Sequence, residues 1–311
     1  MLDVQAVQLS ASAFKTHAFD FYRELRQTAP IAPYRLPNGQ QVMLVTRYDD
    51  VMTVLRDDKR FVKDRENAGL KGAPRWLPRL LRDMQRNMLL VDGDDHWRLR
   101  TLVHKAFTPR MVERLRGRVE ALSHELIDRA LARGRFDLIE DYAFPIPMTV
   151  MSELLGVPEN EREKFRRLSE VIVAVDSTNF DARVMWTMIR FWRYLSALYD
   201  ERRLRPQDDL LTALVQAEET GDKLSGGELI AMGLLLVVAG HETTVNLIAN
   251  GTLALLEHPD QLERLSTEPA LIKPGVEELL RYYGPVEVAT DRFAAHDTEL
   301  SGVPIARGTS L

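Results

Sequence analysis

The sequence contains no cysteine among its 311 residues. This absence excludes disulfides, thiolate metal ligands and cysteine nucleophiles from the chain. A block of one charge sign is also missing, because 41 basic and 46 acidic residues are spread along the sequence and give a net charge of -5. Since nucleic acids are bound by clustered lysine and arginine, we expect no nucleic-acid partner.

Long hydrophobic runs are absent as well. The longest, Leu229–Ala239, is only about half of the roughly 20 residues that a membrane span requires. The N-terminus, MLDVQAVQLSASAFKTH, has neither the basic start nor the continuous apolar stretch of a secretory signal. We therefore expect a cytoplasmic protein without a membrane anchor.

What the sequence does contain is helical periodicity. A hairpin is predicted near the N-terminus, where Asn38-Gly39 separates two extended runs, and a helix capped near Asp49 or Asp50 follows it. Residues 62–90 show no period and predict a long loop. After Gly284-Pro285 the chain turns to short extended pieces. Further helices are predicted over residues 19–30, from Asp92 with an aspartate cap, from a Thr108 N-cap to Gly134, and over 148–155, 159–175, 183–204, 208–219, 225–257, 259–266 and 274–283.

These elements predict a mainly α fold with a minor β-sheet, in the α+β class. No internal repeat or low-complexity linker interrupts them. We therefore expect a single domain over residues 1–311.

The predicted central helix, 225–257, carries the polar sequence AGHETT inside an apolar run. Gly240 costs such a helix about 1 kcal/mol relative to alanine, which favours a flat ligand lying against the backbone there. Glu242 in apolar surroundings needs a partner, water or a proton, and Thr243 can donate a hydrogen bond to the carbonyl of Ala239. Two interpretations stay open: a proton relay to a reaction centre, or a core helix whose polar residues contact other helices.

Two metal-site patterns can be excluded for this helix. The stretch HETTV has Val245 where the zinc-protease pattern H-E-x-x-H requires its second histidine. None of the seven histidines completes the Glu-x-x-His pair of a carboxylate-bridged di-iron bundle. Zinc hydrolysis and di-iron chemistry are therefore not expected.

Two further charged pairs have helical spacing. Glu278 and Arg281 stand three residues apart in VEELLRYYGP, where an exposed ion pair is the simplest interpretation. His96 and Arg100 stand four residues apart in DHWRLR and could grip an anionic group, although surface charge also accounts for them.

Taken in order, DHWRLRTLVHKAFTPR, AGHETT and EELLR, followed by Pro285, Arg292 and ELSGVPIARG, resemble the cytochrome P-450 haem-thiolate monooxygenases of the soluble bacterial type. The resemblance runs from the first predicted helix to the last residue. It implies the P-450 fold, haem b as cofactor, dioxygen and an apolar small molecule as substrates, and a ferredoxin and its reductase as electron donors. It also implies a cytoplasmic monomer.

The resemblance assigns roles to individual residues. Glu242 would be the acid and Thr243 the hydroxyl that deliver protons during oxygen activation. The haem contacts would be His96, Arg100 and Arg292, which hold propionates, with Ala239 and Gly240 beside the cofactor and Glu278 and Arg281 in a structural role close to it. The substrate pocket would be lined by Met88, Leu89, Leu236, Val286 and Val288.

One feature departs from the family pattern. Family members continue into a glycine-rich loop whose cysteine thiolate binds the iron, and this chain has no cysteine and no metal ligand of its own. We interpret the chain as the N-terminal portion of a monooxygenase, truncated before that loop and inactive alone. The alternative is a non-catalytic helical module that binds a ligand or a protein and never binds haem.

Overall fold

The computed structural model describes Leu9, Phe14, residues 17–72, Arg82 and residues 86–107, 109–173, 181–219 and 226–311. Several sequence predictions lie outside these residues: the Thr108 cap, Ser225, residues 174–175 of the predicted 159–175 helix, and 73–81 with 83–85 of the predicted loop. The chain divides into two compact units. The first comprises Met1–Leu99, Val175–Phe180 and Thr290–Leu311, and the second comprises Arg100–Ala174 and Asp181–Ala289.

In its described residues, the first unit combines short strands with helices. Its antiparallel pairs join β1 (Ile31–Arg35) to β2 (Gln41–Val45), β3 (Phe61–Val62) to β4 (Phe293–Ala294), and β5 (Thr298–Leu300) to β6 (Val303–Ile305). The helices are α2 (Ala18–Thr28) and α3 (Tyr48–Arg56). The predicted hairpin is confirmed, because β1 and β2 pair around a turn in which Gly39 has a φ of 84°.

The core of this unit joins segments that are distant in sequence. Its buried residues come from β1, α3, β3 and the C-terminal strands: Ile31, Val54, Phe61, Ala294, Leu300 and Ile305. The predicted aspartate cap of α3 is wrong, since Arg47 precedes the helix and no side chain caps it. Asp50 is instead buried and accepts a hydrogen bond of 2.5 Å from Ser301, at the tip of the β5–β6 hairpin.

The second unit is helical. It contains α6 (Pro109–Arg133), the π-helix η2 (Ile139–Ala143), α7 (Pro145–Leu154), η3 (Glu159–Glu161), α8 (Arg162–Val173), α9 (Ala182–Leu204), α10 (Leu210–Glu219), α11 (Gly226–Glu257), α12 (Pro259–Thr267), η4 (Pro269–Leu271) and α13 (Ile272–Tyr282). Helix α5 (Gly93–Ala106) begins in the first unit and ends in the second. The predicted helices of this region are confirmed to within a few residues. The predominance of helix over three small sheets confirms the predicted fold class.

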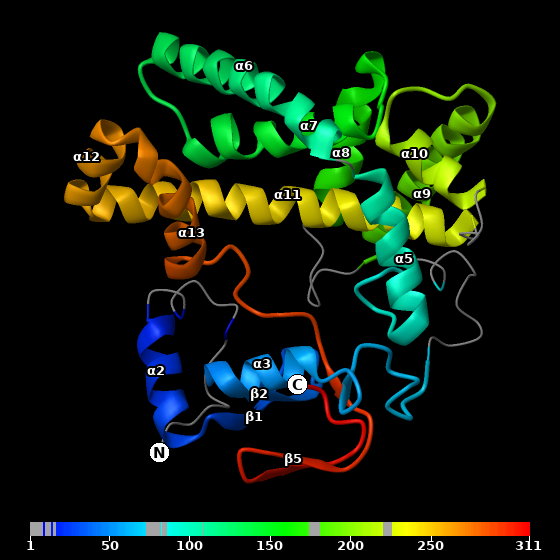
Figure 1. The fold of residues 1–311 in the computed structure, drawn as a ribbon, viewed down its shortest axis with the longest axis vertical. Helices are drawn as coiled ribbons and strands as arrows, with labels where there is room; N and C mark the ends of the chain where they lie inside the picture. The colour runs from blue at the N-terminus through cyan, green and yellow to red at the C-terminus, as the bar shows by residue number, and fades with distance from the viewer. Residues whose placement is uncertain are drawn as a thin grey trace. The chain divides into compact units, whose positions relative to one another are not determined.

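Helix α11 is the central element of the second unit. It packs against η2, α7, α8, α9, α10, α12 and α13, and Figure 1 shows α12 and α13 at its C-terminal end and α9 and α10 at its N-terminal end. By length and composition α11 could cross a membrane, with a mean hydropathy of 1.4 over its most apolar window. Because 61% of that window is buried inside the protein, α11 is accounted for as a core helix.

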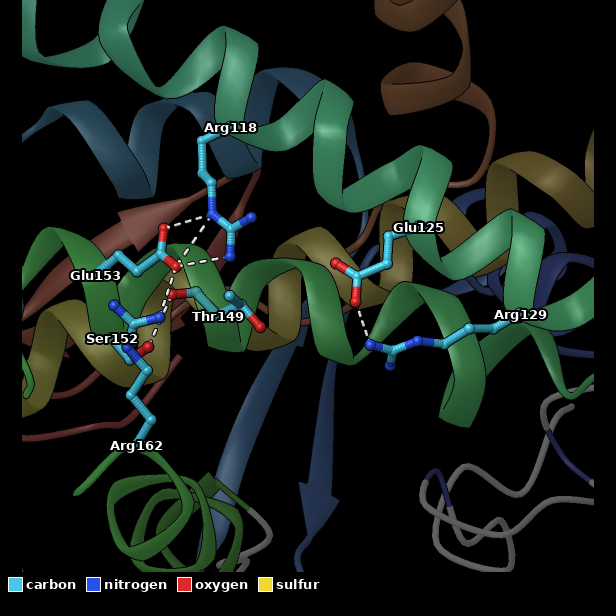
Figure 2. Close-up of polar contacts among 7 residues, drawn as sticks. All are labelled: Arg118, Glu125, Arg129, Thr149, Ser152, Glu153 and Arg162. Carbon is cyan, nitrogen blue, oxygen red and sulfur yellow. Dashed lines mark hydrogen bonds and ion pairs between the residues drawn. The ribbon is translucent and has the colours of Figure 1, made fainter. Parts of the chain in front are cut away.

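A shared carboxylate ties three helices of this unit together. Glu153 in α7 accepts hydrogen bonds from Arg118 in α6, at 2.8 Å from Nη2, and from Arg162 at the start of α8, at 2.8 Å from Nη1 (Figure 2). The Glu153 side chain is only 19% exposed. The Glu125–Arg129 pair in the same figure lies along α6 alone and is exposed.

Candidate functional site

The polar segment Ala239–Thr244 lies in the middle of α11. Thr243 Oγ1 donates a hydrogen bond to the carbonyl oxygen of Ala239 at 2.7 Å, as the sequence predicted. Thr244 makes the same bond to Gly240 at 3.1 Å. Such side-chain bonds to the preceding turn locally weaken the helical ladder and hold each hydroxyl oxygen against the helix.

Glu242 lies in a different environment from the one the sequence suggested. We expected an acid in low-dielectric surroundings, but Glu242 is exposed, as is Ala239, and Thr243 is half-buried. These three residues have the spacing i, i+3 and i+4, so they share one face of α11. The carboxylate therefore needs no buried partner, and it stands on the same helix face as the Thr243 hydroxyl.

Gly240 has a packing reason for lacking a side chain. A Cβ built at this position would lie 2.8 Å from Met151 Sδ and 3.3 Å from Met151 Cγ, both in α7. The argument from the sequence, that the glycine clears room for a flat ligand, is corrected: the space beside its Cα is filled by Met151. Contact between the Gly240 backbone and a cofactor stays a prediction.

His241 is the buried member of the segment. It is 4% exposed, and its ring meets Phe144 edge to face, with centroids 4.6 Å apart. Neither ring nitrogen has a hydrogen-bond partner among the described residues. Burial lowers the pKa of His241, so the neutral imidazole is the favoured form. The residue therefore packs α11 against the segment that joins η2 to α7.

Glu278 and Arg281 form the predicted ion pair on α13. Two hydrogen bonds of 2.6 and 2.7 Å join the guanidinium to the carboxylate. The side chains are 58% and 69% exposed, and their hydrogen bonds lower the pKa of Glu278 and raise that of Arg281. The pair has the bidentate geometry of a strong ion pair, but it is exposed to solvent.

His96 in α5 is held by the backbone of the preceding loop. Its Nδ1 lies 2.7 Å from the carbonyl oxygen of Met88 and 2.9 Å from Lys63 Nζ. The carbonyl only accepts and the ammonium only donates, so each contact calls for a different protonation of Nδ1; Lys63 also donates to the Met88 carbonyl at 3.4 Å. The other ring nitrogen, Nε2, is left for a further partner.

Sequence reasoning missed Lys63 and placed Asp92 only at the start of a helix, not in contact with the segment after β3. The Asp92 carboxylate accepts hydrogen bonds of 2.8 Å from the backbone N–H groups of Lys63 and Asp64 and one of 3.0 Å from Asn67. Its side chain therefore holds the segment after β3, while its carbonyl accepts from the N–H of His96 at the start of α5. No local signal identifies this contact, because it joins residues nearly 30 positions apart.

The two predicted arginines differ in their surroundings. Arg100 in α5 is exposed and forms no ion pair with any described residue. Arg292 is half-buried, and its Nη1 donates to Thr290 Oγ1 at 2.8 Å and to the Thr290 carbonyl at 3.0 Å. Burial lowers the pKa of Arg292, while the nearby carboxylates of Asp92 and Asp291 act in the opposite direction. Both groups keep N–H donors suited to an anion.

The predicted apolar pocket residues are placed separately. Leu236 is buried in α11 at 9% exposure, whereas Val286 and Val288, after α13, are 58% and 62% exposed. In the first unit, Met88 is half-buried and Leu89 is 38% exposed. Because these residues belong to two units, a common pocket stays a prediction.

Comparison with known proteins identifies the family. The sequence model described as "Cytochrome P450" matches residues 5–203 and 193–311. The cytochrome P450 monooxygenase PikC of Streptomyces venezuelae is 44% identical over 301 residues, which cover 96% of this chain and 70% of PikC. The chain belongs to the cytochrome P450 family. A vitamin D(3) 25-hydroxylase of Pseudonocardia autotrophica is 41% identical, over 96% of this chain and 73% of that enzyme.

A solved structure confirms the P450 fold. The cytochrome P450 PksS of the Bacillus subtilis bacillaene polyketide synthase superposes with a TM-score of 0.87 at 38% identity, covering 96% of this chain and 75% of PksS. The predicted family and fold are therefore confirmed, and the chain is of the bacterial P450 monooxygenase type. P450 relatives bind haem b, as predicted for the parent enzyme.

The described residues can be tested against that cofactor. Haem propionates are anions, and His96, Arg100 and Arg292 supply N–H donors of the right chemistry. Among the described residues, no three histidine, aspartate or glutamate side chains converge as a metal site. With no cysteine in the sequence, these 311 residues supply no thiolate ligand. The chemistry of these donors suits the anionic propionates, and their joint action on a haem stays a prediction, whereas the residues of this chain provide no axial thiolate.

Proposed function

We propose that the chain is the part of a haem-dependent monooxygenase that delivers protons and binds an apolar small molecule, with dioxygen as co-substrate. The observation that carries this proposal is the 2.7 Å hydrogen bond from Thr243 to Ala239, on the helix face that Glu242 shares. A hydroxyl held at a fixed point of the helix, with a carboxylate one residue away, suits the transfer of protons from solvent. Glu242 takes up the proton and Thr243 passes it on.

Haem b supplies the oxygen chemistry when it is bound. Its propionates would be held by His96, Arg100 and Arg292, and Ala239 and the Gly240 backbone would lie beside it. Because Nδ1 of His96 faces the Met88 carbonyl and Lys63, Nε2 is the ring nitrogen that would face a propionate. Glu278 and Arg281 would hold α13 in shape close to the cofactor through their ion pair.

The relatives support an apolar substrate. One is described as a vitamin D(3) 25-hydroxylase and another belongs to a polyketide synthase. In this chain the lining residues would be Met88, Leu89, Leu236, Val286 and Val288. Electrons would come from a ferredoxin and its reductase, and we expect a cytoplasmic monomer, without nucleic-acid or membrane partners.

The role of Thr243 can be tested in the enzyme assembled with a cysteine ligand loop. Thr243→Ala removes the hydroxyl, so electron consumption is expected to continue while the fraction that appears as product falls. The measurement is the ratio of hydroxylated product to NAD(P)H consumed, with Thr252→Ala, a threonine of α11 outside the AGHETT segment, as control. Unchanged coupling in Thr243→Ala would contradict the proton-delivery role.

The missing thiolate can be tested on the 311 residues themselves. We expect that this chain, supplied with haem and reduced under carbon monoxide, gives no thiolate-type absorption band, because the sequence has no cysteine. Observing that band would refute the inactivity of the isolated chain. Failure to bind haem under any condition would favour the alternative, a non-catalytic helical module.

A further inference from the structure

A cavity of about 420 Å³ lies on the second unit between α8 and α9. None of its lining residues belongs to the proposed oxygen-activating or haem-binding set. Its size falls in the range of small-molecule sites, roughly 300–1,000 Å³. The cavity is lined by Glu161, Lys164, Leu168, Arg190, Arg193, Tyr194, Ala197, Leu198 and Glu201.

Tyr194 gives this cavity a buried hydrogen-bond donor. The residue is 7% exposed and its hydroxyl oxygen is buried, with the carboxylate of Glu161 as an acceptor outside ideal hydrogen-bond geometry. Burial, together with the hydrogen bond to the Glu161 carboxylate, raises the pKa of Tyr194, so the hydroxyl keeps its proton. Because the contact with Glu161 is not ideal, a ligand oxygen with better geometry can compete for this buried donor.

The charges around the cavity leave an excess of cations. Glu161 pairs with Lys164 at 3.9 Å, and Glu201 lies 3.5 Å from the buried Arg202. Arg190 and Arg193 line the same cavity one helical turn apart on α9, and neither pairs with an acid in the part of the chain that the structure describes. Both acids therefore have cationic partners, whereas two guanidinium groups remain for an anion.

Apolar side chains complete the lining. Leu168 of α8 and Leu198 of α9 are 7% and 4% exposed, so they form a buried apolar wall beside the ring of Tyr194. Lys164 Nζ lies 4.6 Å from the centroid of that ring, a cation–π contact that keeps the ammonium over the aromatic face. A ligand that fits this surface has one anionic end and a short apolar body.

We propose that the α8–α9 cavity is a second ligand site, which binds a small organic carboxylate through Arg190, Arg193 and the Tyr194 hydroxyl, with its apolar body against Leu168 and Leu198. The guanidinium groups donate bidentate hydrogen bonds to the carboxylate. The site stands apart from the proposed monooxygenase chemistry, so it can be tested without haem or activity.

The test compares two probes of the same shape, 4-phenylbutyrate and its uncharged amide, by isothermal titration calorimetry on the 311-residue chain. We expect the carboxylate to bind at least about tenfold more tightly than the amide, because charge-assisted hydrogen bonds are lost with the charge. Arg190→Gln/Arg193→Gln should weaken carboxylate binding by about tenfold or more, and Tyr194→Phe by a few-fold. The matched control is Arg183→Gln, an exposed arginine of α9 that does not line the cavity.

Several outcomes would overturn the proposal. Equal affinity for acid and amide would show an apolar groove without anion recognition. Unchanged affinity in the double variant, at unchanged helix content, would place the carboxylate elsewhere on the protein. Displacement of 4-phenylbutyrate by equimolar inorganic phosphate would show that the apolar part of the ligand does not contribute to binding.

Discussion

Replacing Gly240 with alanine sets two effects of opposite sign against each other. In a helix interior the substitution favours folding by about 1 kcal/mol. The added Cβ, however, would lie 2.8 Å from Met151 Sδ and 3.4 Å from its Cε, and overpacking of a filled core costs roughly 1–3 kcal/mol. Because the methionine side chain is flexible and can partly move, we expect a net destabilisation of about 0–2 kcal/mol.

A matched control separates the two effects. Gly117 lies within α6, and a Cβ there would meet nothing within 4 Å, so Gly117→Ala should stabilise the protein by about 1 kcal/mol. Met151→Ala should remove the clash, so that Gly240→Ala becomes stabilising in that background by about the same amount. The assay is urea unfolding followed by circular dichroism, read as the shift of the midpoint at constant slope.

One result would refute this reasoning. If Gly240→Ala stabilises the protein with Met151 intact as much as Gly117→Ala does, packing against α7 is not what disfavours a side chain at position 240. The interaction free energy between positions 240 and 151 would then be close to zero, instead of the expected value of about 1–3 kcal/mol.

Two further predictions concern the packing of the second unit. Glu153→Gln should lower the free energy of unfolding by about 1–3 kcal/mol, because it removes the negative charge that Arg118 and Arg162 share. The control, Glu125→Gln in the exposed ion pair of α6, should change the free energy of unfolding by less than about 0.5 kcal/mol. Equal urea midpoints for the two variants would contradict this prediction. His241 has a folded-state pKa below its ordinary 6.5, so the unfolded chain binds the proton more readily and stability should fall as pH drops through 6.5. His241→Phe should make the urea midpoint depend less on pH between pH 5 and 7 than it does in the wild type. If the midpoint of the variant depends on pH as strongly as that of the wild type, other groups cause the acid sensitivity.

The helices could be predicted because their signals are local. In α6, proline at the first position and Gly134 beyond the end, with a φ of 72°, mark both boundaries in the sequence itself. The π-helix Ile139–Ala143 was missed, since one widened turn of five residues leaves no period to detect. The predicted α3 cap was wrong because the helix begins at Tyr48, which places Asp49 and Asp50 inside its first turn, and the Asp50 side chain bonds to Ser301, 251 residues away.

In the candidate site, too, local contacts could be predicted from the sequence and long-range contacts could not. The Thr243–Ala239 bond was predictable, because it spans four residues of one helix. The contact of Lys63 with the loop that holds His96 was not, because it depends on how β3 meets the start of α5. The exposure of Glu242 could not be read from its apolar neighbours in sequence, since burial depends on which helices cover each face.

The two interpretations of the AGHETT segment, core packing and a proton relay, apply to different faces of α11. Gly240 faces α7, where its lack of a side chain leaves room for Met151. His241 packs against Phe144 as a neutral aromatic ring. Ala239, Glu242 and Thr243 share another face, on which a carboxylate and a fixed hydroxyl stand together. Core packing and the proposed proton transfer thus involve different residues of one and a half helical turns. Substitutions on the first face should change stability, and substitutions on the second should change the coupling of electrons to product.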